Sequence, residues 1–249
     1  MNKEIIGKNL IELDIVDSTN EYLKKLIKEN DVEEGTVILA DFQTKGKGQK
    51  DGYWESEKGK NLTFSIILYP TFLDVQKQFY LSMGISLGII EFLSHLSVKS
   101  CIKWPNDIYV NKNKVAGILI ENSIKKNLIA HSIIGIGINL NQSEFKSDAP
   151  NPSSLYLELN KTYDTGEAYK ILISYLNKWI NLLYNANFKK IRTRYKKNLY
   201  LINKKTSFTD IKGKFEGKII DVEESGTIII KTDSRKIRKY NFKEVTFPS

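Results

Sequence analysis

Three glycines and three lysines lie within eleven residues, at positions 44–54, in the segment TKGKGQKDGYW. Glycine lets a backbone come close to a ligand and turn its N–H groups toward it, and the lysines add positive charge. This composition favours binding of neighbouring anions, such as a carboxylate beside a phosphate. Neither the Gly-x-x-x-x-Gly-Lys-Ser/Thr nor the Gly-x-Gly-x-x-Gly spacing is present, so the segment alone is a weak motif. A nucleic-acid patch and a solvated turn are the alternatives.

Three more segments with polar or glycine residues follow this loop: KWPND at 103–107, NKVAGIL at 113–119 and GIGINLN at 135–141. Lys114 lies between two β-rich runs and outside any charge cluster, which makes it a candidate cation. Gly117, Gly135 and Gly137 interrupt apolar runs, where glycine normally weakens a sheet, so we expect a ligand to approach the backbone there.

The elements that must position these residues are predicted from periodicity and turn signals. Apolar runs predict strands at residues 10–16, 36–44, 61–70, 101–122 and 128–142, with 101–122 split into two strands by a polar turn at 111–113. Helical spacing of apolar residues predicts helices at 17–30, 74–97 and 167–200. Ser18 and Glu21 have the spacing of a capping box at the start of the first helix. The lysine–glycine loop therefore joins two strands.

The net charge of +9 favours anionic partners, but it comes mainly from scattered lysines, which is typical of a solvated surface. The single cysteine, Cys101, cannot form an internal disulfide and is interpreted as a small buried hydrophobic residue. His131 has no other histidine or cysteine close in sequence, which argues against a metal site there. Because no secretory signal or bilayer-spanning apolar run is recognisable, we expect a cytoplasmic protein with no membrane partner.

These segments, in this order, resemble the biotin protein ligases, which attach biotin to a lysine of a carrier protein. The loop of that family reads Gly-Arg-Gly-Arg-x-Gly-Arg-x-Trp, where this chain has GKGQKDGYW at residues 46–54. The resemblance extends from DSTN at 17–20 to YNFKEV at 240–245, and KWPND followed by NKVAGIL is its most specific part. It implies an α+β, class II synthetase-like fold: a mixed β-sheet flanked by helices for residues 1–200, and a small SH3-like β-barrel for residues 201–249.

The resemblance also implies a reaction in two steps. The biotin carboxylate attacks the α-phosphate of ATP to give biotinyl-5'-AMP, and a lysine of a biotin carboxyl carrier protein then takes the biotinyl group. ATP and biotin are therefore the expected substrates, with Mg²⁺ as the metal. Lys114 is expected to bridge the biotin carboxylate and the α-phosphate. Asp107 is expected either to bind Mg²⁺ or to receive the proton of the acceptor lysine, although a plain Pro-Asn-Asp turn is the alternative.

The resemblance carries a set of binding residues over to this sequence. Those implied for biotin are Ser18, Thr19, Asn20, Gln43, Gly46, Lys47, Gly48, Gln49, Lys114, Gly117 and Gly135. Those implied for ATP or the adenylate are Lys47, Gln49, Lys50, Trp54, Asn106, Lys114 and Asn139. Trp54 resembles the aromatic residue that stacks on adenine once the loop has closed, whereas Trp104 is more typical of a core residue.

Two features depart from the family pattern. Lys47, Gln49 and Gly52 stand where arginines are common, and neither lysine nor glutamine keeps the planar, charged guanidinium fork. We therefore expect this chain to release biotinyl-AMP faster than an arginine-loop relative, and to retain it less well as salt rises. Because only seventeen residues precede Ser18, we expect no N-terminal DNA-binding domain and no DNA partner.

Two other functions are open at this point. A lipoate or octanoate protein ligase or transferase has a related fold, although it is not expected to combine KWPND with this loop. A basic RNA-binding module is suggested by the stretches at 189–198 and 235–242, which interleave aromatic and basic residues. The sequence leaves open the identity of the carrier and whether the chain forms a homodimer.

Overall fold

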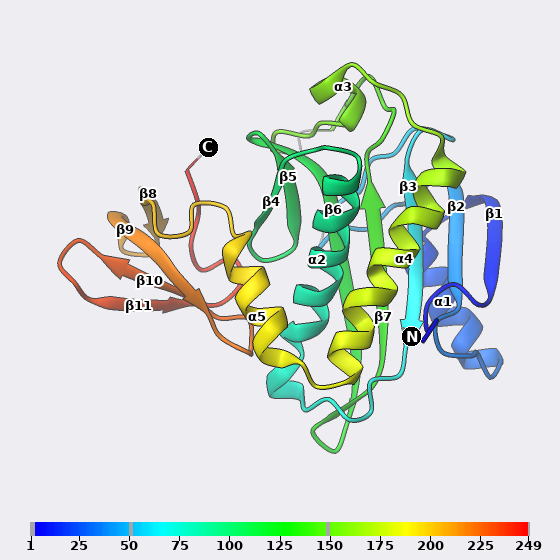
Figure 1. Cartoon of the computed structure of the whole chain (residues 1–249), viewed down its shortest axis with the longest axis horizontal. Helices are drawn as coiled ribbons and strands as arrows, with labels where there is room; N and C mark the ends of the chain where they lie inside the picture. Colours follow the sequence, from blue (N-terminus) through cyan, green and yellow to red (C-terminus); the bar gives the residue numbers. More distant parts are fainter. Residues whose placement is uncertain (1–2, 50–51, 148–149, 249) are drawn as a thin grey trace.

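The structure, a computed structural model, describes residues 3–49, 52–147 and 150–248. Seven strands form one mixed sheet in the order β1-β2-β3-β7-β6-β5-β4 (Figure 1). β1 and β2 are parallel, and every other neighbouring pair is antiparallel. The strands are β1 Leu10–Val16, β2 Val37–Gln43, β3 Leu62–Leu68, β4 Ser100–Lys103, β5 Asp107–Val110, β6 Asn113–Lys125 and β7 Leu128–Ile138.

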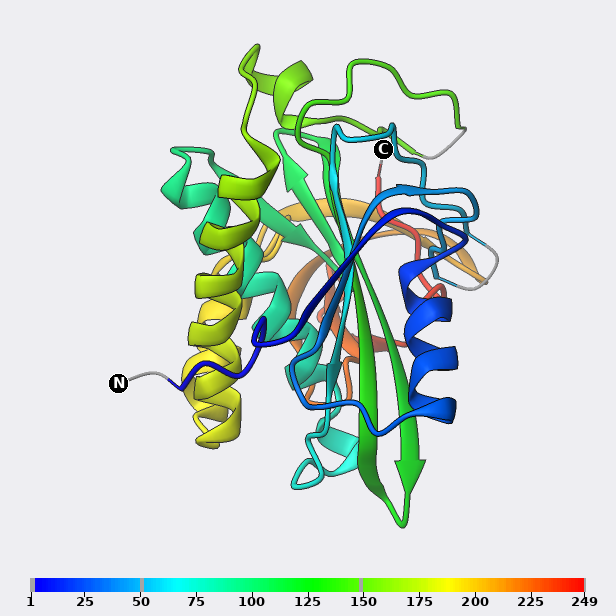
Figure 2. The ribbon, with the colours of Figure 1, turned by 90° about the vertical axis from the view of Figure 1, so that its right-hand side faces the viewer.

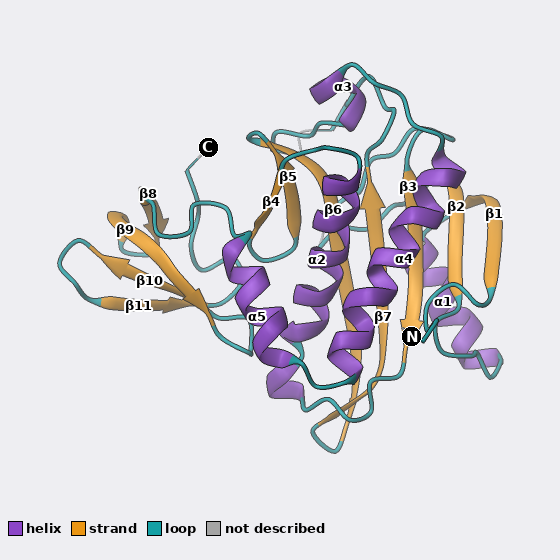
Figure 3. Cartoon of the chain, viewed as in Figure 1, coloured by secondary structure: helices purple, strands orange, loops and turns teal. Residues whose placement is uncertain are grey.

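Helices cover both faces of this sheet (Figure 2). α1 (Thr19–Glu29) packs on β2, β3 and β7, and α2 (Phe79–His95) packs on β4, β5 and β6 from the opposite side. α4 (Thr165–Tyr184) and α5 (Phe188–Lys197) then pack on α2, and Figure 3 shows these three helices in front of the strands. The mixed sheet flanked by helices is confirmed. No helix within the described ranges is long and apolar enough to cross a bilayer.

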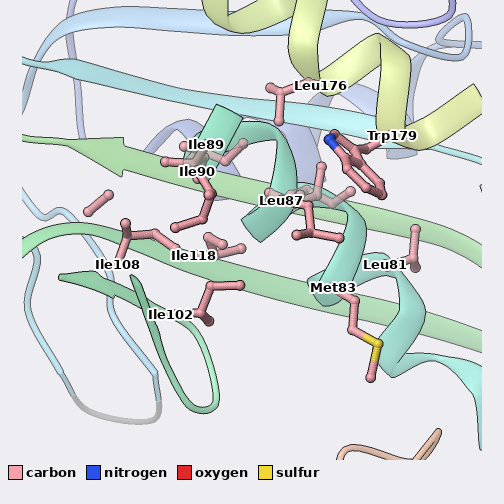
Figure 4. Close-up of a cluster of buried hydrophobic side chains, with 14 of the residues drawn as sticks. Leu81, Met83, Leu87, Ile89, Ile90, Ile102, Ile108, Ile118, Leu176 and Trp179 are labelled. Atoms are coloured by element: carbon pink, nitrogen blue, oxygen red, sulfur yellow. The ribbon is translucent and has the colours of Figure 1, made fainter. Parts of the chain in front are cut away.

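α2 lies at the centre of the main core. Its residues are buried on nearly every side, because the sheet covers one face and α4 and α5 cover the other. Figure 4 shows how its apolar side chains fit between the layers. The labelled residues are Leu81, Met83, Leu87, Ile89 and Ile90 of α2, Ile102, Ile108 and Ile118 of the sheet, and Leu176 and Trp179 of α4. This packing fixes the position of β6 and β7, which carry the glycine segments.

Four C-terminal strands form a separate antiparallel sheet in the order β11-β10-β9-β8. They are β8 Lys205–Asp210, β9 Gly213–Val222, β10 Ile228–Thr232 and β11 Ile237–Tyr240. Trp104 of the main domain is buried against this part: its Nε1 donates to Gly226 O at 2.8 Å, and its ring lies 5.3 Å from that of Phe242. The sheet is compatible with the barrel-like domain expected here, and the division at residue 200 stays a prediction.

Three predicted elements differ from the observed ones. Residues 101–122 hold parts of three strands instead of the two predicted. Trp104-Pro105-Asn106 forms an additional hairpin turn between β4 and β5, because proline has no N–H with which to continue the hydrogen bonding of a strand. The helix predicted at 167–200 is two helices, interrupted at Ala186, whose φ of 51° is incompatible with a continuous helix. The helix predicted from residue 74 begins at Phe79, after a short 3₁₀ turn at Val75–Lys77, and α3 (Leu155–Leu159) was not predicted.

Candidate active site

The segments singled out from the sequence come together on the α1 face of the sheet. They line a cavity of about 60 Å³ between the start of α1, the loop after β2, and strands β6 and β7. Its walls are Ser18, Thr19, Asn20, Gln43, Lys47, Gly48, Gln49, Trp54, Phe64, Asn106, Lys114, Gly117, Ile118, Leu119, Gly135, Ile136 and Gly137. This volume holds only a few water molecules, so the loop must move before a larger ligand can enter.

Gln43, at the end of β2, fixes the first turn of α1. Its Oε1 accepts hydrogen bonds from the Thr19 N–H at 2.8 Å and from Thr19 Oγ1 at 3.1 Å. Ser18 is the N-cap residue, but its side chain makes no capping hydrogen bond, and the Glu21 carboxylate binds Lys24 and Lys47. The predicted capping box is therefore wrong, because lysines occupy the carboxylate that would complete it. Ser18 lines the cavity instead.

Ser65 of β3 joins the side chains that follow Ser18. Its Oγ lies 2.6 Å from Thr19 Oγ1 and 2.5 Å from Asn20 Oδ1, and Asn20 Nδ2 donates to Glu121 Oε2 at 2.8 Å. Gly135, opposite Ser65 in the sheet, makes room for Asn20: a Cβ there would lie 2.5 Å from Asn20 Oδ1. Hydroxyl and amide groups thus form this end of the cavity, which suits an uncharged ligand group bearing N–H and C=O.

The loop after β2 folds back on itself and is tied to α1. The Trp54 N–H donates to Gly46 O at 2.9 Å, and Lys47 Nζ donates to Glu21 Oε1 at 2.7 Å. Lys47, Gly48 and Gln49 reach the cavity wall. Gly46 lies outside it and permits the loop's own hairpin, since a Cβ at this position would lie 2.3 Å from Trp54 O. Lys50, predicted as an adenylate contact, lies outside the described residues.

Glu21, which the sequence suggested as a helix-capping residue, is instead a charged anchor for the loop. Hydrogen bonds from Lys24, and then from Lys47, lower the pKa of the Glu21 carboxyl to about 2. Lys24 also donates to Glu121 of β6 at 2.6 Å. One network therefore connects α1, the loop and β6. The capping-box spacing drew attention to Glu21 but gave it the wrong role. The contributions of Glu121 and Ser65 depend on long-range pairing, which leaves no local signal.

The indole of Trp54 fills the space left by two of the glycines. A Cβ on Gly137 would lie 2.2 Å from Trp54 Cε2, and one on Gly117 would lie 2.9 Å from Trp54 Cζ3. We expected these glycines to admit a ligand, but in this structure side chains of the chain itself occupy the space: Trp54 at Gly117 and Gly137, and Asn20 at Gly135. Trp54 Nε1 is buried there with no hydrogen-bond partner among the described residues.

Lys114 of β6 projects into the same cavity. Its Nζ lies 2.7 Å from Asp107 Oδ1 and 5.6 Å from the centroid of the Trp54 ring, and its side chain is only 25% exposed. The contact between Lys114 and Asp107 is an ion pair, but its geometry is not that of a hydrogen bond. Asp107 Oδ1 accepts no hydrogen bond from any of the described residues. Asn106 Nδ2 donates to Ile118 O at 2.7 Å. Lys114 and the loop lysine Lys47 thus both place positive charge at the cavity, which suits a pair of anions.

Several predicted residues lie elsewhere or have structural partners. Asn139 is buried and is not a wall residue of the cavity; its Nδ2 donates to Ser153 O at 2.9 Å. Asp107 is not a wall residue, and no cluster of three His, Cys, Asp or Glu side chains suited to a metal ion exists among the described residues. Cys101 is half-buried, and burial raises the pKa of its thiol, in keeping with an unreactive side chain.

Comparisons with known proteins show the family of the chain. The model of the biotin/lipoate A/B protein ligase family matches residues 12–139. The bifunctional ligase/repressor BirA of Bacillus subtilis is 28% identical over 238 residues, which cover 94% of this chain and 72% of BirA. The solved structure of the biotin protein ligase from Aquifex aeolicus in complex with biotin and ATP is 30% identical, with a TM-score of 0.80 over 97% of this chain and 99% of that one. The chain belongs to the biotin/lipoate A/B protein ligase family.

Proposed function

We propose that this chain is a biotin protein ligase, which activates biotin with ATP as biotinyl-5'-AMP and transfers the biotinyl group to a lysine of a biotin carboxyl carrier protein. The observation that carries this proposal is the convergence of Lys114, the Ser-Thr-Asn turn and the glycine–lysine loop on one cavity. The similarity to a ligase with biotin and ATP bound extends over nearly the whole chain. Biotin and ATP are thus the two small substrates.

In the first step, a carboxylate oxygen of biotin attacks the α-phosphorus of ATP. A new O–P bond forms, the bond to the β-phosphate oxygen breaks, and pyrophosphate leaves with the electron pair. Both reactants are anions, so the main task of the protein is to hold them together and to place positive charge where phosphate charge grows. Lys114 suits this role because its Nζ, now 2.7 Å from Asp107, lies at the cavity and is only partly solvated.

The uncharged head of biotin suits the hydroxyl and amide end of the cavity. Thr19, Asn20 and Gln43 present hydrogen-bonding groups whose positions are fixed by one another and by Ser65. Because these groups are buried and already oriented, little conformational entropy is lost when a ligand replaces one of their internal partners. Because Gly135 has no Cβ, the Asn20 side chain has room to remain in this position.

The loop would act as a flap over the mixed anhydride. Trp54, with Lys47, Gln49 and the predicted contact Lys50, would leave its present position and close again over the adenylate. The small volume of the cavity supports such a movement, and so does the ion pair between Lys47 and Glu21, whose partners are both partly exposed. Exposed pairs of this kind are weak enough to exchange.

In the second step, the neutral amine of the carrier lysine attacks the carbonyl carbon of biotinyl-AMP. The C–N bond forms, the C–O bond to the phosphate breaks, AMP leaves with that electron pair, and the surplus proton of the amine goes to Asp107. Mg²⁺ would arrive with ATP, because Asp107 is a single carboxylate and Mg²⁺ is usually held by one or two carboxylates together with substrate phosphates. DNA binding and a homodimer are not part of the proposal, and the cytoplasmic location stays a prediction.

The decisive test is incubation with biotin, Mg-ATP and a biotin carboxyl carrier domain, followed by mass spectrometry of the carrier. The carrier should gain one biotinyl group, and only when both biotin and ATP are present. Lipoate and octanoate in place of biotin test the related ligases and transferases. Modification by one of those acids alone would replace the proposal. Tight, salt-sensitive binding of mixed RNA without biotin-dependent pyrophosphate release would favour the RNA-binding alternative.

A further inference from the structure

A second cavity, of about 130 Å³, adjoins the first one. The two share Gln49, Asn106 and Ile118 as wall residues. The remaining walls of the second cavity are Gln78, Phe79, Ser82, Pro105, Ile120, Asn122, Ser225 and Phe242. The reaction proposed above leaves this space unused.

The second cavity is uncharged. All of its described wall residues are apolar, hydroxyl or amide side chains, whereas the cations Lys47 and Lys114 line the first cavity. Phosphate groups require positive partners, so the triphosphate of ATP belongs with the lysines. An apolar wall interrupted by a few amides suits instead a long hydrocarbon chain that ends in a hydrogen-bond donor.

The position of the second cavity makes it reachable by a protein. β5 pairs with β6 only up to Gly117, so Ile120 and Asn122 lie farther along β6, beyond its last pair with β5. The opposite walls come from the start of α2 and from the C-terminal part of the chain, at Ser225 and Phe242. Gln49 is the only wall residue from the loop among those described. Apart from Gln49, the second cavity is thus walled by the sheet, the start of α2 and the C-terminal part of the chain, so a lysine carried on a protein would reach the first cavity beside the loop.

We propose that the second cavity is the channel for the acceptor lysine of the carrier protein; this rests on the function proposed above. The four methylenes of the lysine would lie against Phe79, Pro105 and Ile120. The amine would meet Asn106 at the junction of the two cavities. Asn106 Nδ2 donates to Ile118 O at 2.7 Å, which directs Oδ1 away from that carbonyl, and none of the described residues donates to Oδ1. It is therefore free to accept an N–H of the amine.

The channel also explains how the amine becomes reactive. A lysine ammonium in an uncharged cavity loses solvation, which lowers its pKa and favours the neutral, nucleophilic amine. The ammonium releases one proton to solvent on entry. The nitrogen lone pair then attacks the biotinyl carbonyl, AMP leaves with the electrons of the C–O bond, and the second proton passes from the new amide nitrogen to Asp107, as in the step described above. Asn106 holds the amine in line for this attack, so it is a positioning residue.

Filling the channel should separate the two half-reactions. In Ile120→Trp we expect biotinyl-AMP formation from biotin and Mg-ATP to stay normal, and hydroxylamine, a small nucleophile, to capture the intermediate normally. Transfer to the carrier domain should fall at least about ten-fold, a loss of about 1.4 kcal/mol of transition-state stabilisation. The matched control is Ile15→Trp, the same change at a 58% exposed position of β1 on the far side of the sheet, which should leave transfer unchanged.

A second variant makes the test independent of folding. Ile120→Cys is purified in active form and then modified with benzyl methanethiosulfonate, with treated wild type as the control for Cys101. Transfer should fall at least about ten-fold after modification and return with dithiothreitol. Unchanged transfer at full modification would overturn the channel. A parallel fall in biotinyl-AMP formation would also overturn it, because the cavity would then hold part of ATP. Failure of the unmodified enzyme to make biotinyl-AMP would count against the function itself.

Discussion

Gly137→Ala should expel Trp54 from the active-site cavity. A Cβ on residue 137 would lie 2.2 Å from Cε2, 2.4 Å from Cζ2 and 2.6 Å from Nε1 of the indole, well inside van der Waals contact. Gly137 is paired with Thr63 of β3 and with Gly117 of β6. These neighbouring strands hold β7 in place, so it cannot shift to make room for the Cβ. The side chain on the loop must therefore move.

The substitution destabilises the closed state of the loop, in which Trp54 packs against Gly137. Trp54 loses the burial of its ring, worth about 1.5–3 kcal/mol for a large apolar side chain, and the contact of its ring with Lys114, worth about 0.5–1 kcal/mol. A total of about 2–4 kcal/mol corresponds to a roughly 30- to 700-fold smaller closed population. If Trp54 packs on Gly137 again when the loop closes over biotinyl-AMP, the intermediate should escape faster by a comparable factor.

Tryptophan fluorescence reports the change directly. The chain has three tryptophans, and Trp104 and Trp179 are 4% and 2% exposed, so a red shift in Gly137→Ala would come from Trp54. Rapid mixing gives the release rate of biotinyl-AMP in the same variant. Gly84→Ala is the matched control, since a Cβ there meets nothing closer than 3.8 Å, and its spectrum should equal that of the wild type. An unshifted emission in Gly137→Ala, with normal retention, would refute the packing of Trp54 on this glycine.

Three more predictions concern the same site. Because the pKa of Glu21 falls from 4.5 to about 2 on pairing, the contact with Lys47 is present above 4.5 and is lost as pH falls toward 2. Trp54 emission should follow that loss, and Glu21→Gln, which removes the charge, should show no such titration. Release of biotinyl-AMP should accelerate between about 0.1 M and about 1 M salt, as the Debye length shortens from about 10 to about 3 Å; a salt-independent rate would contradict a lysine-held loop. Ser65→Ala removes a buried partner of Thr19 and Asn20, so steady-state kinetics should show KM for biotin rising about ten-fold with kcat unchanged. A fall in kcat alone would contradict a role in biotin binding.

The sequence predicted those parts of the site that depend on local pattern. Alternating strands on both sides of residues 44–54 placed the loop correctly between β2 and β3, and Lys114 does reach the cavity. The partners that depend on sheet register were not predictable. Ser65 meets Asn20 because β3 lies beside β7 and α1 crosses both, and the long-range pairing of strands leaves no local signal.

The direction of side chains was the second feature that could not be predicted from the sequence. Glycines in a strand indicate a close approach, but the pattern does not say whether a ligand or another side chain approaches, and here it is Trp54 and Asn20. Spacing alone suggested a capping box at Ser18, yet a carboxylate prefers the nearby ammonium groups of Lys24 and Lys47 to a backbone N–H. The break at Ala186 in the last predicted helix was not predictable either, because no glycine or proline marks it in the sequence.

In the proposed first half-reaction, Lys114 holds the biotin carboxylate and the α-phosphate together. The most direct measurement is biotin-dependent pyrophosphate release and biotinyl-AMP formation in single-turnover mixing of Lys114→Ala with biotin and Mg-ATP, without carrier. Lys112→Ala, an exposed lysine in the same hairpin, is the control. Lys114→Ala should fail to form the adenylate, while Lys112→Ala should form it at the wild-type rate. Biotinyl-AMP formation by Lys114→Ala at that same rate would contradict this role of Lys114.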